Sequence, residues 1–384
     1  MRILPRFLIA LSVLAPASLP IASAQQANTS QPMPTPEVKG PEVLLAVTVR
    51  DKRGNMVNNL TSADLTLTED GRPQTITSFT RDSKAPFRVG LLIDTSRSML
   101  PAMNDERKAA SKFLEAMLPD DANVPGRATD AFLVHFDRQV ELLEDFSSTR
   151  DKLQHELDNI GPTSGGSHSP QGPETVDDDR SYGGRGGGAG TTQLYDAIYL
   201  ASDELMKLKP GRKALIVFSD GEDRGSKETM NDAIDAADRA NTAIYTIYLK
   251  GQGERSETPF PGISRRGGMG YPGGGYPGGG YPGGGYPGGG SGRSGDDRAS
   301  QADARKTLET IATRTGGRYF EARKKENLGE IYNAIADELR NQYVLTYTPD
   351  KRINEDEYHK IVLKAKNADL TVATREGYYM PDSK

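Results

Sequence analysis

The centre of the chain alternates short apolar runs with segments whose apolar residues recur every three or four positions. The apolar runs predict strands, which we expect at 87–93, 130–136, 213–218, 242–249 and 318–321. The longer period predicts helices at 101–118, 148–160, 193–208, 227–241, 303–314 and 327–342. Near-continuous apolar strands that alternate with helices are typical of a doubly wound, mostly parallel α/β sheet.

The two flanks of this region have a different pattern. Short alternating strands are expected before it at 43–49, 64–68 and 74–79, and after it at 343–348, 360–365 and 370–374. Neither set alone has enough strands to bury a sheet face comfortably. The flanks therefore predict one β-sandwich, built from 41–84 and 343–384, into which the α/β domain is inserted. Two independent hairpin modules are the alternative.

The first 24 residues have the pattern of an export signal. Arg2 and Arg6 precede an apolar stretch at 7–19, and an Ala-Ser-Ala cleavage site ends at Ala24. An uncleaved anchor or a buried N-terminal helix is the alternative. Residues 25–40 are polar and contain prolines, which predicts a flexible leader. No later stretch approaches the roughly 18 apolar residues of a membrane span. We therefore expect an exported protein, periplasmic, secreted or at the cell surface, with no stable membrane span after cleavage.

Two stretches, about 161–190 and 251–300, are rich in glycine and poor in apolar residues. Neither can bury enough apolar surface to offset the entropy of ordering, so we expect disordered loops. The second contains the repeat YPGGG, which begins at Tyr271 and occurs four times. One interpretation is an aromatic spacer for contact with the cell wall or with a second copy of the protein. The other is a tolerated loop expansion.

The composition fits this organisation and excludes several functions. The 384 residues include 42 glycines and only 35% hydrophobic residues, as expected if the inserts lie outside the core. The absence of cysteine excludes disulfides, thiolate metal sites and catalytic thiols. A net charge of -5 argues against nucleic-acid binding, which needs a basic face. The chain also lacks the GxSxG, phosphate-loop and HExxH motifs, so we do not expect an enzyme.

Oxygen-bearing side chains gather where the predicted strands end. Asp94, Ser96 and Ser98 follow the first strand, Asp220 ends another, and Thr192 opens a helix after the first insert. Ligands bind at the carboxyl edge of such sheets, where loops from several strands meet. Two carboxylates and three hydroxyls suit a hard divalent cation, Mg²⁺ first, with Mn²⁺ or Ca²⁺ as alternatives. Taken alone, the Asp94-x-Ser-x-Ser segment has a competing interpretation as a helix N-cap turn.

This set resembles the metal-ion-dependent adhesion site of von Willebrand factor type A (VWFA) domains, because all five positions occur in the expected order. The resemblance covers about 85–340, and we expect the VWFA-like domain at 85–342. The flanking segments, among them YVLTYTPD and TREGYYMP, look like exported VWFA-related proteins of acidobacterial type.

The resemblance implies a role for each site residue. Ser96 and Ser98 would bind the metal directly, and Thr192 directly or through water. Asp94 and Asp220 would act mainly through waters and through hydrogen bonds to the hydroxyls. An Asp or Glu carboxylate of a partner protein would then replace one metal-bound water.

The sequence departs from the family pattern at Ser219, where a threonine is usual, and in the insert before Thr192. That insert either covers the metal face, widens the contact surface or supplies its own acidic ligand. Thr191 is the alternative to Thr192 in register. Glu222 and Asp223 either hold a second cation or belong to a solvated loop.

We therefore expect a metal-dependent protein-binding or adhesion module. The alternative function is a structural envelope protein that acts through the β-sandwich and the YPGGG loop, with no metal-dependent partner.

Overall fold

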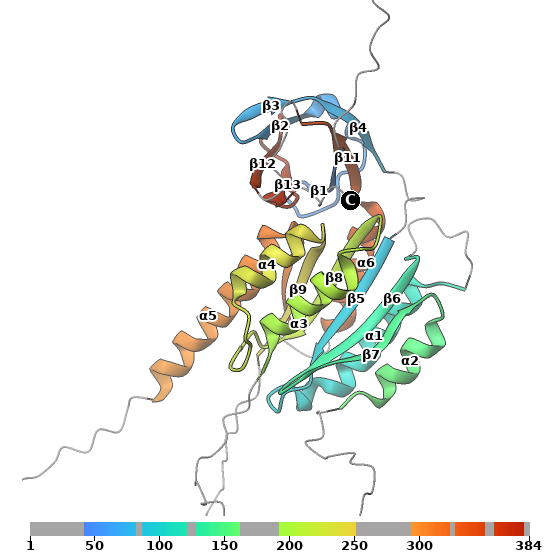
Figure 1. Ribbon diagram of the computed structural model, residues 1–384, viewed down its shortest axis with the longest axis vertical. Coiled ribbons are helices and arrows are strands. Elements are labelled where there is room, and N and C mark those ends of the chain that lie inside the picture. The colour runs from blue at the N-terminus through green and yellow to red at the C-terminus, as the bar shows by residue number, and fades with distance from the viewer. Residues whose placement is uncertain are drawn as a thin grey trace, which may run out of the picture. The chain divides into compact units, whose positions relative to one another are not determined.

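The computed structural model describes seven segments of the chain (Figure 1), which are 42–81, 87–120, 128–161, 192–250, 293–322, 327–349 and 357–379. The predicted signal at 1–24, the leader at 25–40 and nearly all of both glycine-rich inserts lie outside the described residues. Those expectations stay predictions, as does the choice between Thr191 and Thr192, because Thr191 also lies outside them.

A six-stranded sheet forms the centre of the α/β region, in the order β10-β9-β8-β5-β6-β7. Its strands are β5 (Phe87–Asp94), β6 (Asp130–Phe136), β7 (Val140–Ser147), β8 (Arg212–Ser219), β9 (Ala243–Leu249) and β10 (Tyr319–Ala322). All neighbours pair in parallel except β7, which runs antiparallel to β6. Every residue of β8 is buried, and this explains its continuous apolar pattern, because helices cover both faces of such a strand.

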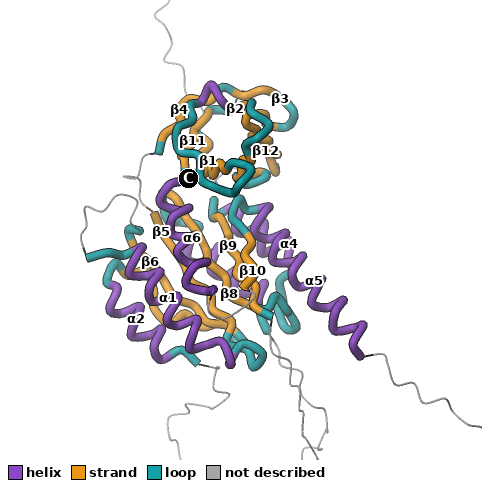
Figure 2. Tube along the Cα trace, turned by 180° about the vertical axis from the view of Figure 1, so that it is seen from behind, coloured by secondary structure: helices purple, strands orange, loops and turns teal. Residues whose placement is uncertain are grey.

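Helices cover the two faces of this sheet in two layers. On one face lie α1 (Met103–Met117), α2 (Arg150–Asn159) and α6 (Leu328–Asn341), which Figure 2 shows nearest the viewer. On the other face lie α3 (Leu194–Leu200), α4 (Met230–Arg239) and α5 (Arg293–Arg314). Each layer has its own apolar core against the sheet. The predicted doubly wound, mostly parallel α/β fold is confirmed.

Strands from both ends of the chain form two four-stranded sheets, in the orders β13-β1-β11-β4 and β14-β12-β2-β3. These strands are β1 (Val43–Arg50), β2 (Leu65–Glu69), β3 (Arg72–Gln74), β4 (Ile76–Thr80), β11 (Tyr343–Tyr347), β12 (Tyr358–Ala365), β13 (Thr371–Ala373) and β14 (Gly377–Tyr379). Early and late strands pair directly, β1 with β11 and β2 with β12, and the two sheets share one apolar core. The shared β-sandwich is therefore confirmed in place of two separate hairpins.

The α/β domain and the sandwich meet through α6, which leads directly into β11. Glu338 near the end of α6 is buried and pairs with Arg50 of β1. The same carboxylate accepts a 3.2 Å hydrogen bond from the Tyr245 hydroxyl of β9. Gln342, between α6 and β11, donates to the Tyr245 hydroxyl oxygen at 2.9 Å. A buried polar network therefore joins the inserted domain to the sandwich.

Several elements differ from the expectation. Strands β3, β7 and β14 were not predicted from the sequence. The single helix predicted at 193–208 is α3 followed by a π-helical segment at Ala201–Met206. Helix α5 begins at Arg293, inside the stretch 251–300 expected to be disordered, so that limit of the insert was wrong. The missed strands are short, or lie at a sheet edge with a half-exposed, charged pattern that hides the strand period.

Candidate metal centre

The loop after β5 is held tightly at the carboxyl edge of the sheet. Asp94 is fully buried, and its Oδ1 accepts a 2.9 Å hydrogen bond from the Ser96 backbone N–H. Met99 N–H donates to the Ser96 carbonyl at 2.9 Å, which closes the turn that leads into α1. Thr95 N–H donates to the carbonyl of Phe136, the last residue of β6, also at 2.9 Å. The Asp94 carboxylate therefore holds a turn but caps no helix, because the caps of the following 3-10 turn and of α1 are Met99 and Ala102, without a side-chain hydrogen bond.

The end of β8 completes this arrangement from the neighbouring strand. The Ser219 hydroxyl donates to Asp94 Oδ2 at 2.6 Å, and the Ser98 hydroxyl donates to Asp220 Oδ2 at the same distance. The hydroxyl oxygens of Ser96 and Ser98 are 3.2 Å apart. The structure thus brings together four of the residues singled out in the sequence: Asp94, Ser96, Ser98 and Asp220. Ser219, which in the sequence is only a departure from a family pattern, thus holds Asp94 in place, a role that the sequence pattern did not predict.

Thr192 reaches the same edge through its backbone. It is buried, and its carbonyl accepts a 3.0 Å hydrogen bond from Arg224 N–H in the loop after β8. The next residue, Gln193, donates to the carbonyl of Asp137 in the loop after β6 at 2.9 Å. The segment that opens α3 is therefore anchored between the loops of two strands that flank β5.

Burial and like charge act together on the two carboxylates. Burial, together with the smaller effect of the negative charge of Asp220, raises the pKa of Asp94 to about 7, against the opposing hydrogen bonds from Ser219 and Ser96. Two carboxylates in one buried site repel each other when both are ionised. A divalent cation would remove that repulsion. The donor set, carboxylate and hydroxyl oxygens without imidazole or thiolate, fits a hard cation.

The neighbouring acidic residues Glu222 and Asp223 already have partners in the loop. Asp223 Oδ1 accepts from the Ser226 hydroxyl at 2.6 Å and from Tyr195 N–H at 3.2 Å. Glu222 forms a 2.7 Å ion pair with Arg224. These contacts favour the loop interpretation over a second cation site, because Asp223 fixes the loop to the start of α3 and Glu222 is paired within the loop.

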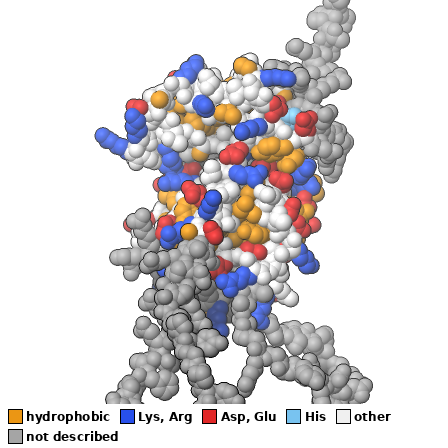
Figure 3. All heavy atoms as spheres, turned by 90° about the vertical axis from the view of Figure 1, so that its left-hand side faces the viewer, with side chains coloured by type: hydrophobic (Ala, Val, Ile, Leu, Met, Phe, Trp, Pro, Cys, Tyr) orange, Lys and Arg blue, Asp and Glu red, His pale blue; other side chains and the backbone are white. Residues whose placement is uncertain are grey.

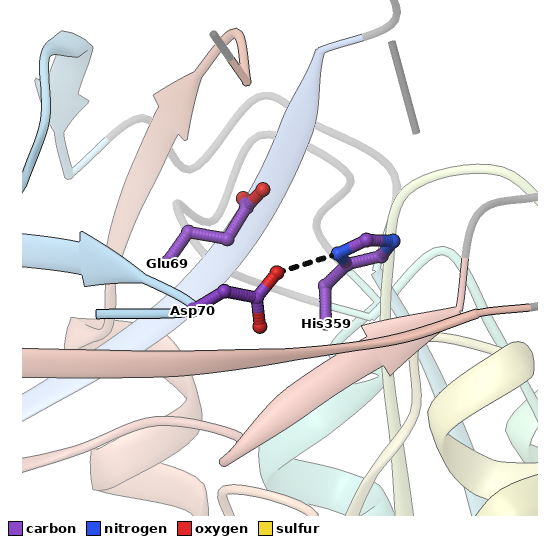
Figure 4. Close-up of side chains that lie close together, drawn as sticks. All are labelled: Glu69, Asp70 and His359. Carbon is purple, nitrogen blue, oxygen red and sulfur yellow. Dashed lines mark hydrogen bonds and ion pairs between the residues drawn. The ribbon is translucent and has the colours of Figure 1, made fainter. Parts of the chain in front are cut away.

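A second group of metal-capable side chains lies in the sandwich (Figure 4): Glu69, Asp70 and His359. Asp70 and His359 form an ion pair of 2.9 Å, and Asp70 also accepts from Lys360 N–H at 2.9 Å. Glu69 accepts from the hydroxyls of two buried tyrosines, Tyr347 and Tyr378, at 2.5 and 3.1 Å. The acceptor groups are thus already engaged, and the cluster ties the turn between β2 and β3 to β12.

Two surface properties bear on the partner. On the face shown in Figure 3, Lys and Arg side chains are interspersed with Asp and Glu among the described residues, without a continuous basic stripe. Within the described part of the chain, no helix combines the length and the apolar character needed to cross a membrane.

No protein-family model matches the chain, and no curated protein matches it. Similar solved structures include an aerotolerance-related membrane protein from Bacteroides fragilis, with 16% identity and a TM-score of 0.37, covering 66% of this chain and 98% of that one. The vWF domain of the type V pili tip protein Mfa5 from Porphyromonas gingivalis is 13% identical, with a TM-score of 0.40 and coverage of 66% and 94%.

A third similar structure is proximal thread matrix protein 1 from the mussel byssus, which has a zinc-occupied MIDAS motif. It is 11% identical with a TM-score of 0.41, and the match covers 71% of this chain but only 50% of the mussel protein. At such low identities and TM-scores, the function of this chain has to be inferred from its own residues.

Proposed function

We propose that the chain is an exported, metal-dependent protein-binding module. A divalent cation, Mg²⁺ first, is held by Asp94, Ser96, Ser98, Thr192 and Asp220, and it coordinates an Asp or Glu carboxylate of a partner protein. The observation that carries the proposal is the pair of hydrogen bonds, 2.6 Å each, from Ser219 to Asp94 and from Ser98 to Asp220. They fix both carboxylates and one hydroxyl at the edge where ligands of such sheets bind.

The hydroxyls are the direct metal ligands in this proposal. A hydroxyl that donates its hydrogen to a carboxylate keeps its oxygen lone pairs for a cation. Ser98 is in that situation, since it donates to Asp220, and Ser96 Oγ lies 3.2 Å from it. Thr192 binds directly or through water. Asp94 and Asp220 orient the hydroxyls and bind metal-bound waters.

The chemistry that the cation supplies is electrostatic attraction for an anionic group. Few direct carboxylate ligands leave it with residual positive charge, and Mg²⁺ keeps several waters in its coordination shell. A partner carboxylate can replace one of them. The chain's own residues hold the cation and shape the surface around it, so this function requires no covalent step.

The cellular location belongs to the same proposal. The export signal pattern at 1–24 and the likeness of the flanks to exported VWFA-related proteins support a module in the periplasm or outside the cell. An acidic surface of a protein in that compartment is the partner class.

The test is capture of partners from an envelope extract on immobilised protein. Wild-type protein is compared in Mg²⁺ and in EDTA, with Ser96→Ala as the site variant and Ser62→Ala in the sandwich as the matched control. We expect a partner retained by wild type and Ser62→Ala in Mg²⁺, released by EDTA and not retained by Ser96→Ala. Replacing the acidic residues of that partner one at a time should identify a single carboxylate that abolishes retention. Retention that is unchanged in EDTA and in Ser96→Ala would refute metal dependence and favour the structural envelope protein.

A further inference from the structure

Three exposed arginines belong to the loops at the metal-bearing edge of the α/β sheet. Arg97 lies between Ser96 and Ser98 in the loop after β5. Arg138 lies in the loop after β6, and Arg224 lies in the loop after β8. These loops follow neighbouring strands, because β5 pairs with both β6 and β8. The edge that we propose for the cation therefore has an exposed arginine on each of three adjacent loops.

Backbone hydrogen bonds hold two of these arginines next to the segment that opens α3. The Arg224 N–H donates to the Thr192 carbonyl at 3.0 Å. Arg138 directly follows Asp137, whose carbonyl accepts a 2.9 Å hydrogen bond from Gln193 N–H. Thr192 is one of the proposed metal ligands, and each arginine is at most one residue away from one of these bonds. Both guanidinium groups therefore belong to the surface around the proposed cation.

The buried acidic residues of the same edge are held inside it by hydrogen bonds. Asp94 and Asp220 each accept from a serine hydroxyl. Asp196, in the first turn of α3, is only 8% exposed and accepts from the N–H groups of Lys227 and Glu228, both at 2.9 Å. Carboxylates in such positions direct their lone pairs at donors of the protein itself. An approaching partner therefore meets the exposed arginines before it meets these acids.

The contacts of the arginines single out Arg138. Arg224 forms a 2.7 Å ion pair with Glu222, a half-exposed acid that offsets much of its charge. Among the described residues, no carboxylate forms an ion pair with the Arg138 guanidinium. An exposed arginine of this kind is common on protein surfaces, and what distinguishes Arg138 is its place beside Thr192. A guanidinium group there matches the planar, bidentate geometry of a carboxylate from outside the chain.

We propose that the partner binds through an acidic segment with at least two carboxylates, one on the cation and a second on Arg138. This inference rests on the metal-dependent function proposed for the same edge, and it adds the class of partner. A cation alone attracts any accessible carboxylate, so a second contact is needed to discriminate between partners. Arg97 adds positive charge to the same surface, which favours the encounter with an acidic segment.

The test compares two fluorescent peptides that bind to the full chain in excess Mg²⁺, by fluorescence anisotropy. One peptide has a single glutamate among glycines and serines, and the other has three consecutive glutamates in the same background. We expect the three-glutamate peptide to bind roughly tenfold more tightly or better. Arg138→Gln should lose most of this preference, whereas Arg53→Gln, at an exposed arginine of the sandwich, should keep it. Titration calorimetry should give Arg138→Gln at least the Mg²⁺ affinity of wild type, because the variant has one positive charge fewer near the cation.

The acidic segment and the metal-dependent function fail in different ways. Equal affinity for the two peptides, with both released by EDTA, would overturn the acidic segment and leave the metal-dependent function in place. Equal loss of the preference in Arg138→Gln and Arg53→Gln would also overturn it, because it would show a diffuse charge effect. So would the absence of saturable binding of the three-glutamate peptide. Binding of that peptide that is unchanged in EDTA but weakened by Arg138→Gln would retain the arginine contact and refute the role of the metal.

Discussion

The Ser98 hydroxyl donates a 2.6 Å hydrogen bond to Asp220 Oδ2, across 122 positions of the chain. The bond joins the loop after β5 to the loop after β8, which are adjacent parallel strands. It places a hydroxyl oxygen, with its lone pairs available, beside a carboxylate at the carboxyl edge of the sheet. A cation site that depends on this bond should respond to changes in either partner.

Asp220→Asn is therefore expected to weaken Mg²⁺ binding by roughly 10–100-fold, the usual effect of losing a group that orients a metal ligand. The amide keeps the shape of the side chain but loses the negative charge and one acceptor oxygen. Titration calorimetry of Mg²⁺ into the protein measures the effect. Asp369→Asn, an exposed acid of the sandwich, is the control and should bind Mg²⁺ like wild type. Equal affinity of Asp220→Asn and wild type would remove Asp220 from the site.

Gly221, directly after Asp220, is expected to be essential for the geometry of the site. Its φ is +75°, and an added Cβ would lie 2.8 Å from the Ala304 carbonyl oxygen of α5. Gly54 has a similar φ of +82° but nothing within 4 Å of an added Cβ, which makes it the matched control. Gly54→Ala should lower the free energy of unfolding by about 1–2 kcal/mol, the strain of a left-handed residue. Gly221→Ala should lower the free energy of unfolding by more than Gly54→Ala does, and it should weaken Mg²⁺ binding as well. Denaturant unfolding of both variants tests the first expectation, which equal losses of unfolding free energy would contradict.

Glu106 of α1 makes stability depend on pH. It is buried and accepts a hydrogen bond from the Tyr332 hydroxyl of α6, and burial raises its pKa from 4.5 to about 8. Between pH 4.5 and about pH 8 the Glu106 carboxyl is deprotonated in the unfolded chain but protonated in the folded chain. The free energy of unfolding therefore falls as the pH rises through this range.

Glu106→Gln removes this loss. The variant should be more stable than wild type at pH 8, by an amount on the order of a few kcal/mol, and nearly equal to it at pH 5. Glu115→Gln, at an exposed position of the same helix, should be as stable as wild type at both pH values. Thermal unfolding of wild type and both variants at pH 5 and pH 8 measures these differences in stability. A gain of the same size at pH 5 and pH 8 would show that the effect is not titration of Glu106.

The ion pair between Glu338 and Arg50 is expected to hold the sandwich to the inserted domain. Glu338 is buried and forms a second ion pair, of 3.6 Å, with Arg318. The side chains of its two cationic partners, Arg50 and Arg318, are 19% and 41% exposed. Glu338→Gln should therefore cost about 2 kcal/mol of stability, less than the 3–5 kcal/mol typical when a fully buried pair is broken. Asp337→Asn, at a 72% exposed side chain, is the control with little effect. Denaturant unfolding measures the stability of both variants. If Glu338→Gln unfolds with the same free energy as wild type, the ion pair does not hold the sandwich to the inserted domain.

The fold could be predicted from the sequence because its strands and helices have different periods. The buried strands read as continuous apolar runs, and the flanking strands alternate, as β12 does with every second residue buried. Strand β7 was missed because Glu141, Glu144 and Asp145 interrupt its pattern at an exposed sheet edge. Strand β14 has only three residues, too few to show a period.

The gathering of Asp94, Ser96, Ser98 and Asp220 could also be foreseen, since the carboxyl ends of parallel strands share one edge. The bond from Ser219 to Asp94 could not, because it depends on the register of β5 against β8, which pairs Ile93 with Phe218. Nothing in the local sequence around Arg50 indicates its partner Glu338, 288 positions away. Such contacts follow from tertiary packing alone.

The most direct test of the metal centre is anomalous diffraction from crystals of the full chain soaked in Mn²⁺. The account predicts one strong manganese peak bound by the hydroxyls of Ser96 and Ser98, and its loss in Ser98→Ala crystals. A peak beside Glu69, Asp70 and His359 with none at Ser96 and Ser98, or no manganese peak at all, would contradict it.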